Sequence, residues 1–146
     1  MQVDFYHLTE LPLDRVLPQI AAKVLADGAR LLIVHADADE RARLDRHLWT
    51  YAADSFLPHA QLGAGDDAAQ PILLAPEVDA ANAARYIALA DGQWRDDALD
   101  FDRAFHFFDE ERIADARAAW RSVKARDWVE PRYWKINDQG RWEQLQ

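Results

Sequence analysis

A single α/β domain with helices on both sides of a mostly parallel β-sheet is the fold class that the sequence predicts. The chain has 146 residues, of which 50% are hydrophobic and 29% charged, and this suits one domain with a sizeable core. Short runs rich in β-branched and aromatic residues alternate with segments in which apolar residues recur at helical spacing. One run, at residues 30–35, is apolar enough for a strand buried on both faces, which is typical of parallel sheets. We therefore expect residues 1–146 to form one three-layer domain.

The first 35 residues predict a strand, a helix and a second strand. The strands are VDFYH at residues 3–7 and RLLIVH at residues 30–35. Between them, LDRVLPQIAAKVLADG carries an apolar stripe at helical spacing and reaches Gly28, a residue typical of helix ends. Because proline lacks an amide hydrogen and disfavours helix in the residue before it, we expect the regular helix to begin near Pro18, after a kinked turn.

The next segment predicts a second helix followed by a long loop. DADERARLDRHLW begins with Asp37 and Asp39, either of which suits a helix N-cap, and the helix is expected to end at about Trp49. The stretch from Tyr51 to Gln70 contains a proline, two glycines and paired aspartates, and we expect no regular structure there.

Three further strands and one helix complete the prediction. PILLA, RYIALAD and RAFHFFD, which begin at residues 71, 85 and 103, have strand composition. EERIADARAAWRSVKAR is the clearest helix of the chain. The tail YWKINDQGRWEQLQ is ambiguous, and a hairpin around Gln139 and Gly140 is one alternative.

Several kinds of site are absent from the sequence. The chain has no cysteine, so disulfides, thiolate zinc sites and cysteine nucleophiles are excluded. It contains neither a GxxxxGK[ST] loop nor a GxGxxG motif, and its five histidines do not form a metal-binding motif. We therefore expect a Rossmann-like topology without its nucleotide motif, and neither cofactor nor metal.

One alternative is a small α/β enzyme. His35, Asp37 and Asp39 follow a predicted strand at its carboxyl end, where α/β enzymes often place their active sites. The same residues also suit the capped N-terminus of a helix, where acidic groups favour the helix dipole. The sequence offers no nucleophile and base that can be paired, so no reaction class follows from this alternative.

The charge distribution indicates the kind of partner. A net charge of −9 argues against general affinity for nucleic acid, which requires clustered Lys and Arg. Residues 1–102 hold 8 Lys and Arg against 18 Asp and Glu, whereas residues 103–146 hold 9 against 8. A basic end on an acidic body suggests a local site for a negatively charged partner.

The location of the protein is also suggested by composition. No run approaches the roughly 18 uncharged apolar residues that a membrane span requires. The N-terminus MQVDFYHLTE lacks the basic and then apolar layout of a secretion signal. We therefore expect a cytoplasmic protein that does not bind membranes.

The predicted helix near the C-terminus carries two parallel rows of side chains. An apolar row should pack on the sheet, and it consists of Ile113, Ala116, Trp120 and Val123. Arg117, Arg121 and Lys124 form a basic row beside it. A solvated charged face is the usual explanation of such a row, but acidic partners at helical spacing are scarce here.

A second alternative is direct binding of single-stranded nucleic acid, for which the tail interleaves aromatic with basic residues: Trp128, Arg132, Tyr133, Trp134, Lys135, Arg141 and Trp142.

The aromatic residues of LWTYAADSFLPH, at residues 48–59, have two possible roles. Large aromatic side chains such as Trp49 and Phe56 usually belong to the core. Aromatic residues in a loop on a rigid scaffold are also typical of a surface that binds a partner.

Five segments spread over nearly the whole chain form a distinctive set. They are VDFYHL, LDRHLWTYAADSFLPH, QPILL, FDEERIADARAAWRSVKA and YWK, of which LWT followed by SFLPH is the most specific. Their order resembles the chi subunit family of bacterial DNA polymerase III, an accessory component of the clamp-loader assembly. The resemblance implies a non-enzymatic adaptor that pairs with the psi subunit and binds the acidic C-terminal tail of single-stranded-DNA-binding protein. DNA is then contacted only indirectly, and a helicase-like repair protein is a further possible partner.

The resemblance also implies site residues. Arg117 matches the central arginine of the family's tail-binding pocket and Arg121 matches its second cation. The other residues expected at that pocket are Arg112 and Lys124 as further cations and Phe108, Trp120 and Val123 as candidates for its apolar wall. The surface expected for psi consists of Trp49, Tyr51, Phe56, Leu57 and Pro58.

Overall fold

A computed structural model describes residues 1–9, 11–50 and 57–146. Within these ranges the strands form one eight-stranded sheet. The strands are β1 (Gln2–His7), β2 (Leu31–Val34), β3 (His59–Gln61), β4 (Ile72–Ala75), β5 (Tyr86–Leu89), β6 (Arg103–Phe108), β7 (Glu130–Ile136) and β8 (Trp142–Gln144). Their order across the sheet is β3-β4-β2-β5-β6-β1-β7-β8, and every neighbouring pair is parallel except β7 with β8.

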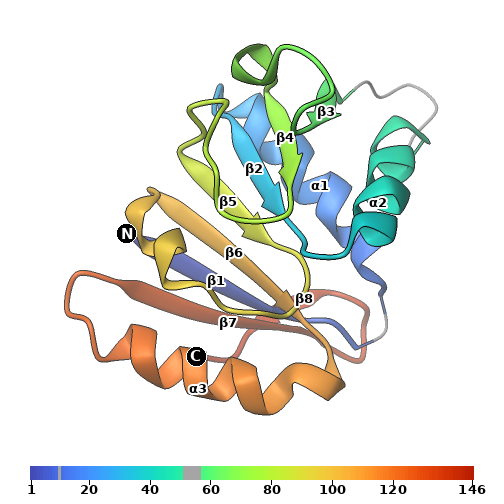
Figure 1. The fold of residues 1–146 in the computed structure, drawn as a ribbon. Coiled ribbons are helices and arrows are strands. Elements are labelled where there is room, and N and C mark those ends of the chain that lie inside the picture. The colour runs from blue at the N-terminus through green and yellow to red at the C-terminus, as the bar shows by residue number, and fades with distance from the viewer. Residues whose placement is uncertain (10, 51–56) are drawn as a thin grey trace.

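Helices cover both faces of this sheet (Figure 1). One face packs against α1 (Leu13–Ala26) and α2 (Ala38–Thr50), and the other against α3 (Ile113–Lys124). Since side chains alternate along a strand, Val3 and Phe5 of β1 join the core beneath α3, whereas Tyr6 joins the core beneath α1 and α2. The predicted three-layer α/β fold with a mostly parallel sheet is thereby confirmed.

The first helix begins earlier than expected. It starts at Leu13, and Pro18 lies inside it. The amide of Arg15 donates to the carbonyl of Pro12 at 3.1 Å, which closes the first turn. A proline within a helix costs about 3 kcal/mol. Burial of Val16 and Leu17 against the sheet contributes about 1.5–3 kcal/mol for each side chain, so packing offsets the lost hydrogen bond.

The predicted loop between residues 51 and 70 contains a strand that composition did not reveal. Residues His59–Gln61 form β3, which pairs in parallel with β4 at the edge of the sheet. The buried ring of His59 lies 2.6 Å from the carbonyl oxygen of Leu57 and 2.9 Å from that of Asp45. Contacts with distant parts of the chain therefore stabilise β3, and the prediction of a loop was wrong for these three residues.

The tail adopts the hairpin that the sequence left as one alternative. Strands β7 and β8 are antiparallel, and Gly140 occupies the turn between them with a φ of +76°. The side-chain oxygen of Asn137 accepts from the amides of Gln139 and Arg141. Because β7 lies beside β1, the tail continues the central sheet.

None of the helices in the described ranges combines the length and apolar character that a membrane crossing requires.

Candidate functional site

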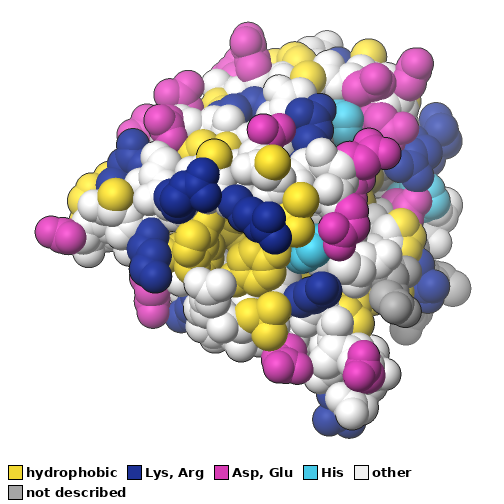
Figure 2. Space-filling model, turned by 90° about the horizontal axis from the view of Figure 1, so that it is seen from below, with side chains coloured by type: hydrophobic (Ala, Val, Ile, Leu, Met, Phe, Trp, Pro, Cys, Tyr) yellow, Lys and Arg dark blue, Asp and Glu magenta, His cyan; other side chains and the backbone are white. Residues whose placement is uncertain are grey.

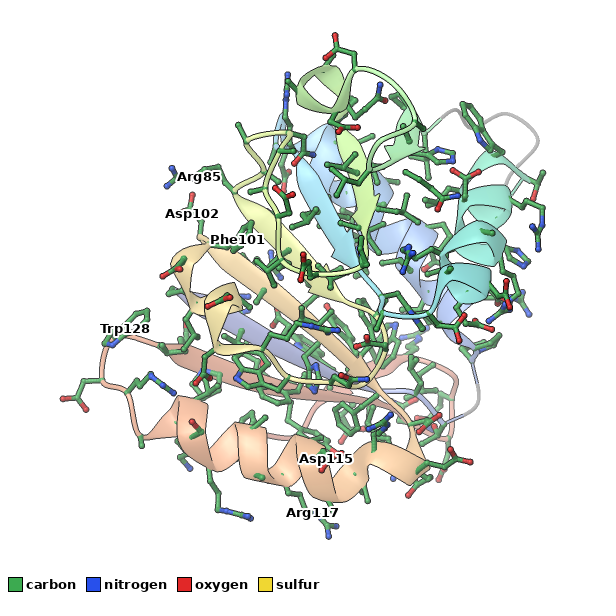
Figure 3. The ribbon with its side chains drawn as sticks, in the orientation of Figure 1. Arg85, Phe101, Asp102, Asp115, Arg117 and Trp128 are labelled. Carbon is green, nitrogen blue, oxygen red and sulfur yellow. The ribbon has the colours of Figure 1, made fainter. Side chains whose placement is uncertain are left out.

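The basic row of α3 faces away from the sheet. Asp109 accepts a hydrogen bond from the amide of Glu111 at 3.0 Å and begins a short 3-10 turn, η3 (Glu110–Arg112), which leads into the helix. Ala116, Ala119 and Val123 are buried against the sheet. The row is therefore exposed, and Figure 3 shows Arg117 pointing outward from the helix. This basic row consists of Arg117, Arg121 and Lys124.

Among the described residues, the three cations of the row have no acidic partner. No carboxylate in the part of the chain that the structure describes lies within ion-pair distance of any of them. Arg112 differs, since its guanidinium lies 3.4 Å from Asp115, and Arg126 lies 3.8 Å from Asp96. In a protein with a net charge of −9, an unpaired basic row is a ready site for an acidic ligand.

Aromatic side chains border the basic row. Trp120 is half-buried, and its ring meets that of Tyr133 edge-on, with the ring centres 6.0 Å apart. Seen from the side on which α3 lies, Lys and Arg side chains gather around hydrophobic surface, with acidic side chains and a histidine nearby (Figure 2). Val123 and Phe108 are 0% and 2% exposed and belong to the core. Of the three residues expected at the apolar wall, Trp120 is therefore the one that reaches the surface.

Tyr133 also belongs to this surface. The sequence had suggested a different role for it, as one of the aromatic residues of a tail that binds nucleic acid. Its hydroxyl lies 3.1 Å from Nδ1 of His7, and Nε2 of His7 lies 2.9 Å from Oε1 of Glu110. Burial raises the pKa of Tyr133, and the charge of Arg117 opposes this rise. The alternation of side chains along a strand beside α3 is the signal that would have found Tyr133, but it requires knowing that residues 130–136 pair with β1.

Arg112 lies apart from the basic row. It belongs to η3 and lines an open cavity of about 500 Å³ at the carboxyl ends of the parallel strands, together with His35. Its side chain crosses Gly92, where an added Cβ would approach Cγ of Arg112 to 2.8 Å. The structure thus brings together Arg117, Arg121 and Lys124 but does not place Arg112 with them.

His35, Asp37 and Asp39, the residues of the alternative enzyme site, take part in hydrogen bonds at the start of α2. Oδ1 of Asp37 accepts from the amides of Asp39 and Glu40 at 2.8 and 3.1 Å, which makes Asp37 the N-cap of α2. Nδ1 of His35 accepts from the amide of Asp37 at 3.1 Å, and burial lowers the pKa of His35. No group of His and acidic residues suited to a metal occurs among the residues that the structure describes. These contacts support the interpretation as a capped helix.

The surface expected for psi lies at the other side of the molecule. Trp49, near the end of α2, is 48% exposed, and its ring centre lies 4.2 Å from that of His59. Leu57 is buried and Pro58 is half-buried, whereas Tyr51 and Phe56 lie outside the described residues. Figure 1 places α2, which carries Trp49, and α3 on opposite sides of the sheet, so Trp49 lies apart from the basic row.

Comparisons with known proteins agree on one family. A family model described as "DNA polymerase III chi subunit, HolC" matches residues 1–129, which extend from β1 through α3. The DNA polymerase III subunit chi of Escherichia coli strain K12 is 36% identical to this chain over 62 residues. That alignment covers 42% of the chain and 42% of the relative, so the chain matches less than half the length of this curated relative.

Proposed function

Because the chain belongs to the family of DNA polymerase III chi subunits, we propose that it is a non-catalytic adaptor of the replication machinery. In this proposal one surface binds the psi subunit and through it the clamp loader. The other surface binds the acidic C-terminal tail of single-stranded-DNA-binding protein. Such an adaptor acts in the cytoplasm and meets DNA only through the protein that coats it.

The basic row supports this proposal, because it lies beside exposed aromatic surface and has no acidic partner among the residues that the structure describes. Arg117 presents a planar guanidinium suited to a forked contact with the terminal carboxylate of a peptide. Arg121 and Lys124 then face the acidic residues that precede the terminus. Trp120 and Tyr133 offer apolar surface for the last side chain of the peptide.

The structure favours a peptide over nucleic acid at this surface. Trp134 of β7 stacks on Tyr6 and donates a hydrogen bond to Oδ1 of Asp4, on the sheet face opposite α3. Trp142 meets Tyr6 edge-on, on that same face. These two rings are therefore turned away from the basic row and cannot form with it the stacking platform that single-strand binding uses.

The exposed Trp49 supports the proposal for psi. A tryptophan with nearly half of its surface exposed is a common centre of a protein interface. Tyr51, Phe56 and Pro58 remain proposed contacts, whereas Leu57 is 4% exposed and belongs to the core. We also propose a helicase-like repair protein as an alternative partner of this surface.

Calorimetry with two synthetic peptides tests the proposed tail site. Both peptides carry several aspartates and an apolar C-terminal residue, but one ends in a free carboxylate and the other in an amide. We expect the free carboxylate to bind at least tenfold more tightly and its affinity to fall as salt rises to physiological strength. Bare single-stranded DNA serves as the comparison. Equal binding of both peptides, or tighter binding of the DNA at physiological salt, would contradict the proposal.

A further inference from the structure

Three side chains from three elements form a chain of polar contacts beside Arg117. Tyr133 lies on β7, His7 at the end of β1 and Glu110 on η3. The Tyr133 hydroxyl is 3.1 Å from Nδ1 of His7. Nε2 of His7 is 2.9 Å from Oε1 of Glu110, a distance that suits an ion pair when His7 is protonated, although the two groups do not have hydrogen-bond geometry. His7 is 2% exposed and stacks on Phe108 with ring centres 5.0 Å apart, so its ring is held in place. Glu110, in contrast, is exposed.

The protonation of His7 determines which way the Tyr133 hydroxyl can act. In neutral His7 with its proton on Nε2, facing Glu110, Nδ1 can only accept, so the hydroxyl of Tyr133 donates to it. The tyrosine oxygen is then left as an acceptor, which disfavours an approaching carboxylate. When both ring nitrogens are protonated, Nδ1 donates to the tyrosine oxygen, and the hydroxyl hydrogen is free for a ligand.

We propose that Tyr133 contacts the carboxylate of an acidic peptide bound at the basic row, and that His7 switches the Tyr133 hydroxyl from acceptor to donor. This inference rests on the proposed tail site. It assigns Tyr133 as a ligand-binding residue and His7 as a positioning residue that acts through it. Glu110 takes part by stabilising the protonated ring of His7.

The charged groups that face His7 couple this switch to binding. Burial lowers the pKa of His7, and Glu110 opposes this by charge and contact. Lys135 of β7 and Arg117 of α3 lower the pKa further through their positive charges. A carboxylate bound to Arg117 offsets one of these charges, so the pKa of His7 rises on binding. The complex therefore takes up a proton, and affinity increases as the pH falls toward the pKa of His7.

Isothermal titration with the free-carboxylate acidic peptide between pH 8 and pH 5.5 tests the switch. This range stays above the ordinary pKa values of the peptide's carboxylates. We expect affinity to rise about threefold to tenfold as the pH falls, the range of one hydrogen bond. Titrations in buffers with different heats of ionisation measure proton uptake directly, and the uptake should increase as the pH falls below 6.5, the ordinary value from which burial lowers the pKa of His7.

Four variants separate the switch from general electrostatics. Tyr133→Phe and His7→Phe should each flatten the pH dependence, and Glu110→Gln should move it to lower pH. Glu111→Gln is the matched control, because it removes the same charge from the neighbouring residue and should leave the profile unchanged. Histidine NMR signals of the unmodified protein give a second readout, in which the pKa of His7 should rise when the peptide is added.

The outcomes distinguish the two proposals. Peptide binding whose pH dependence survives in both Tyr133→Phe and His7→Phe, or an unchanged pKa of His7 in the complex, would overturn the switch and leave the tail site standing. Absence of peptide binding at every pH would overturn the tail site and the switch with it.

Discussion

Replacing Arg117 with glutamate tests the tail site most directly. The side chain is exposed on α3 and has no acidic partner among the residues that the structure describes, so the folded state loses little. Exposed substitutions of this kind change stability by about 0.5 kcal/mol or less. The peptide, in contrast, loses a charge-assisted hydrogen bond of about 1.5–3 kcal/mol. It also meets a like charge, which adds about 1 kcal/mol at a distance of about 4 Å in water.

The expected loss of binding energy is therefore about 2.5–4 kcal/mol, or roughly a seventyfold to several-hundredfold weaker affinity. Calorimetry with the free-carboxylate peptide measures it, and a thermal melt of the same variant checks the fold. Arg46→Glu is the matched control, since Arg46 is an exposed arginine on α2 and the charge change is the same. A folded Arg117→Glu variant that binds as tightly as the Arg46→Glu control would show that Arg117 does not contact the peptide.

The remaining predictions concern the second surface and the core. Trp49→Ala should weaken psi binding by about 2 kcal/mol. Because the residue is 48% exposed, the melting temperature should change little. A large loss of stability would instead assign Trp49 to the core. Asp4→Ala should lower the free energy of unfolding, measured in urea, by about 3 kcal/mol. The reason is that Asp4 is 0% exposed and accepts hydrogen bonds from Arg103 and Trp134. A loss below about 1 kcal/mol would contradict this prediction. Burial lowers the pKa of His106 to about 4, below its value of 6.5 in the unfolded chain. Only the unfolded state then binds a proton between these values, so stability should fall as the pH drops from about 6.5 to 4, and urea titrations of His106→Phe should show a smaller fall.

Much of the fold was predictable from local patterns. The apolar run at residues 31–34 became the buried strand β2, because such runs are stable only where both faces are covered. The spacing of Ala116, Trp120 and Val123 identified the inner side of α3, and therefore the outer side that carries Arg117. These patterns repeat within a single element, so they can be read without knowing what the element packs against.

Other features depended on partners far along the chain. β3 exists because β4 offers an edge to pair with and because its buried histidine meets Asp45, and neither contact leaves a local signal. Pro18 was accommodated within α1 because the helix buries its neighbours against the sheet. Helix propensity accounts for the destabilisation caused by the proline, but it does not include the stabilisation from burial of the neighbouring side chains.

Local sequence patterns were enough to predict the fold class, the basic face of α3 and the family resemblance, and the comparisons confirmed the family. Which residues share a surface depends instead on how the elements pack in three dimensions. This packing placed Tyr133 and His7 beside Arg117 through the parallel pairing of β7 with β1, and it separated Arg112 from the basic row. Periodicity reports which side of one element is apolar, whereas a binding site forms where several elements meet. Long-range strand pairing and burial determine which elements meet.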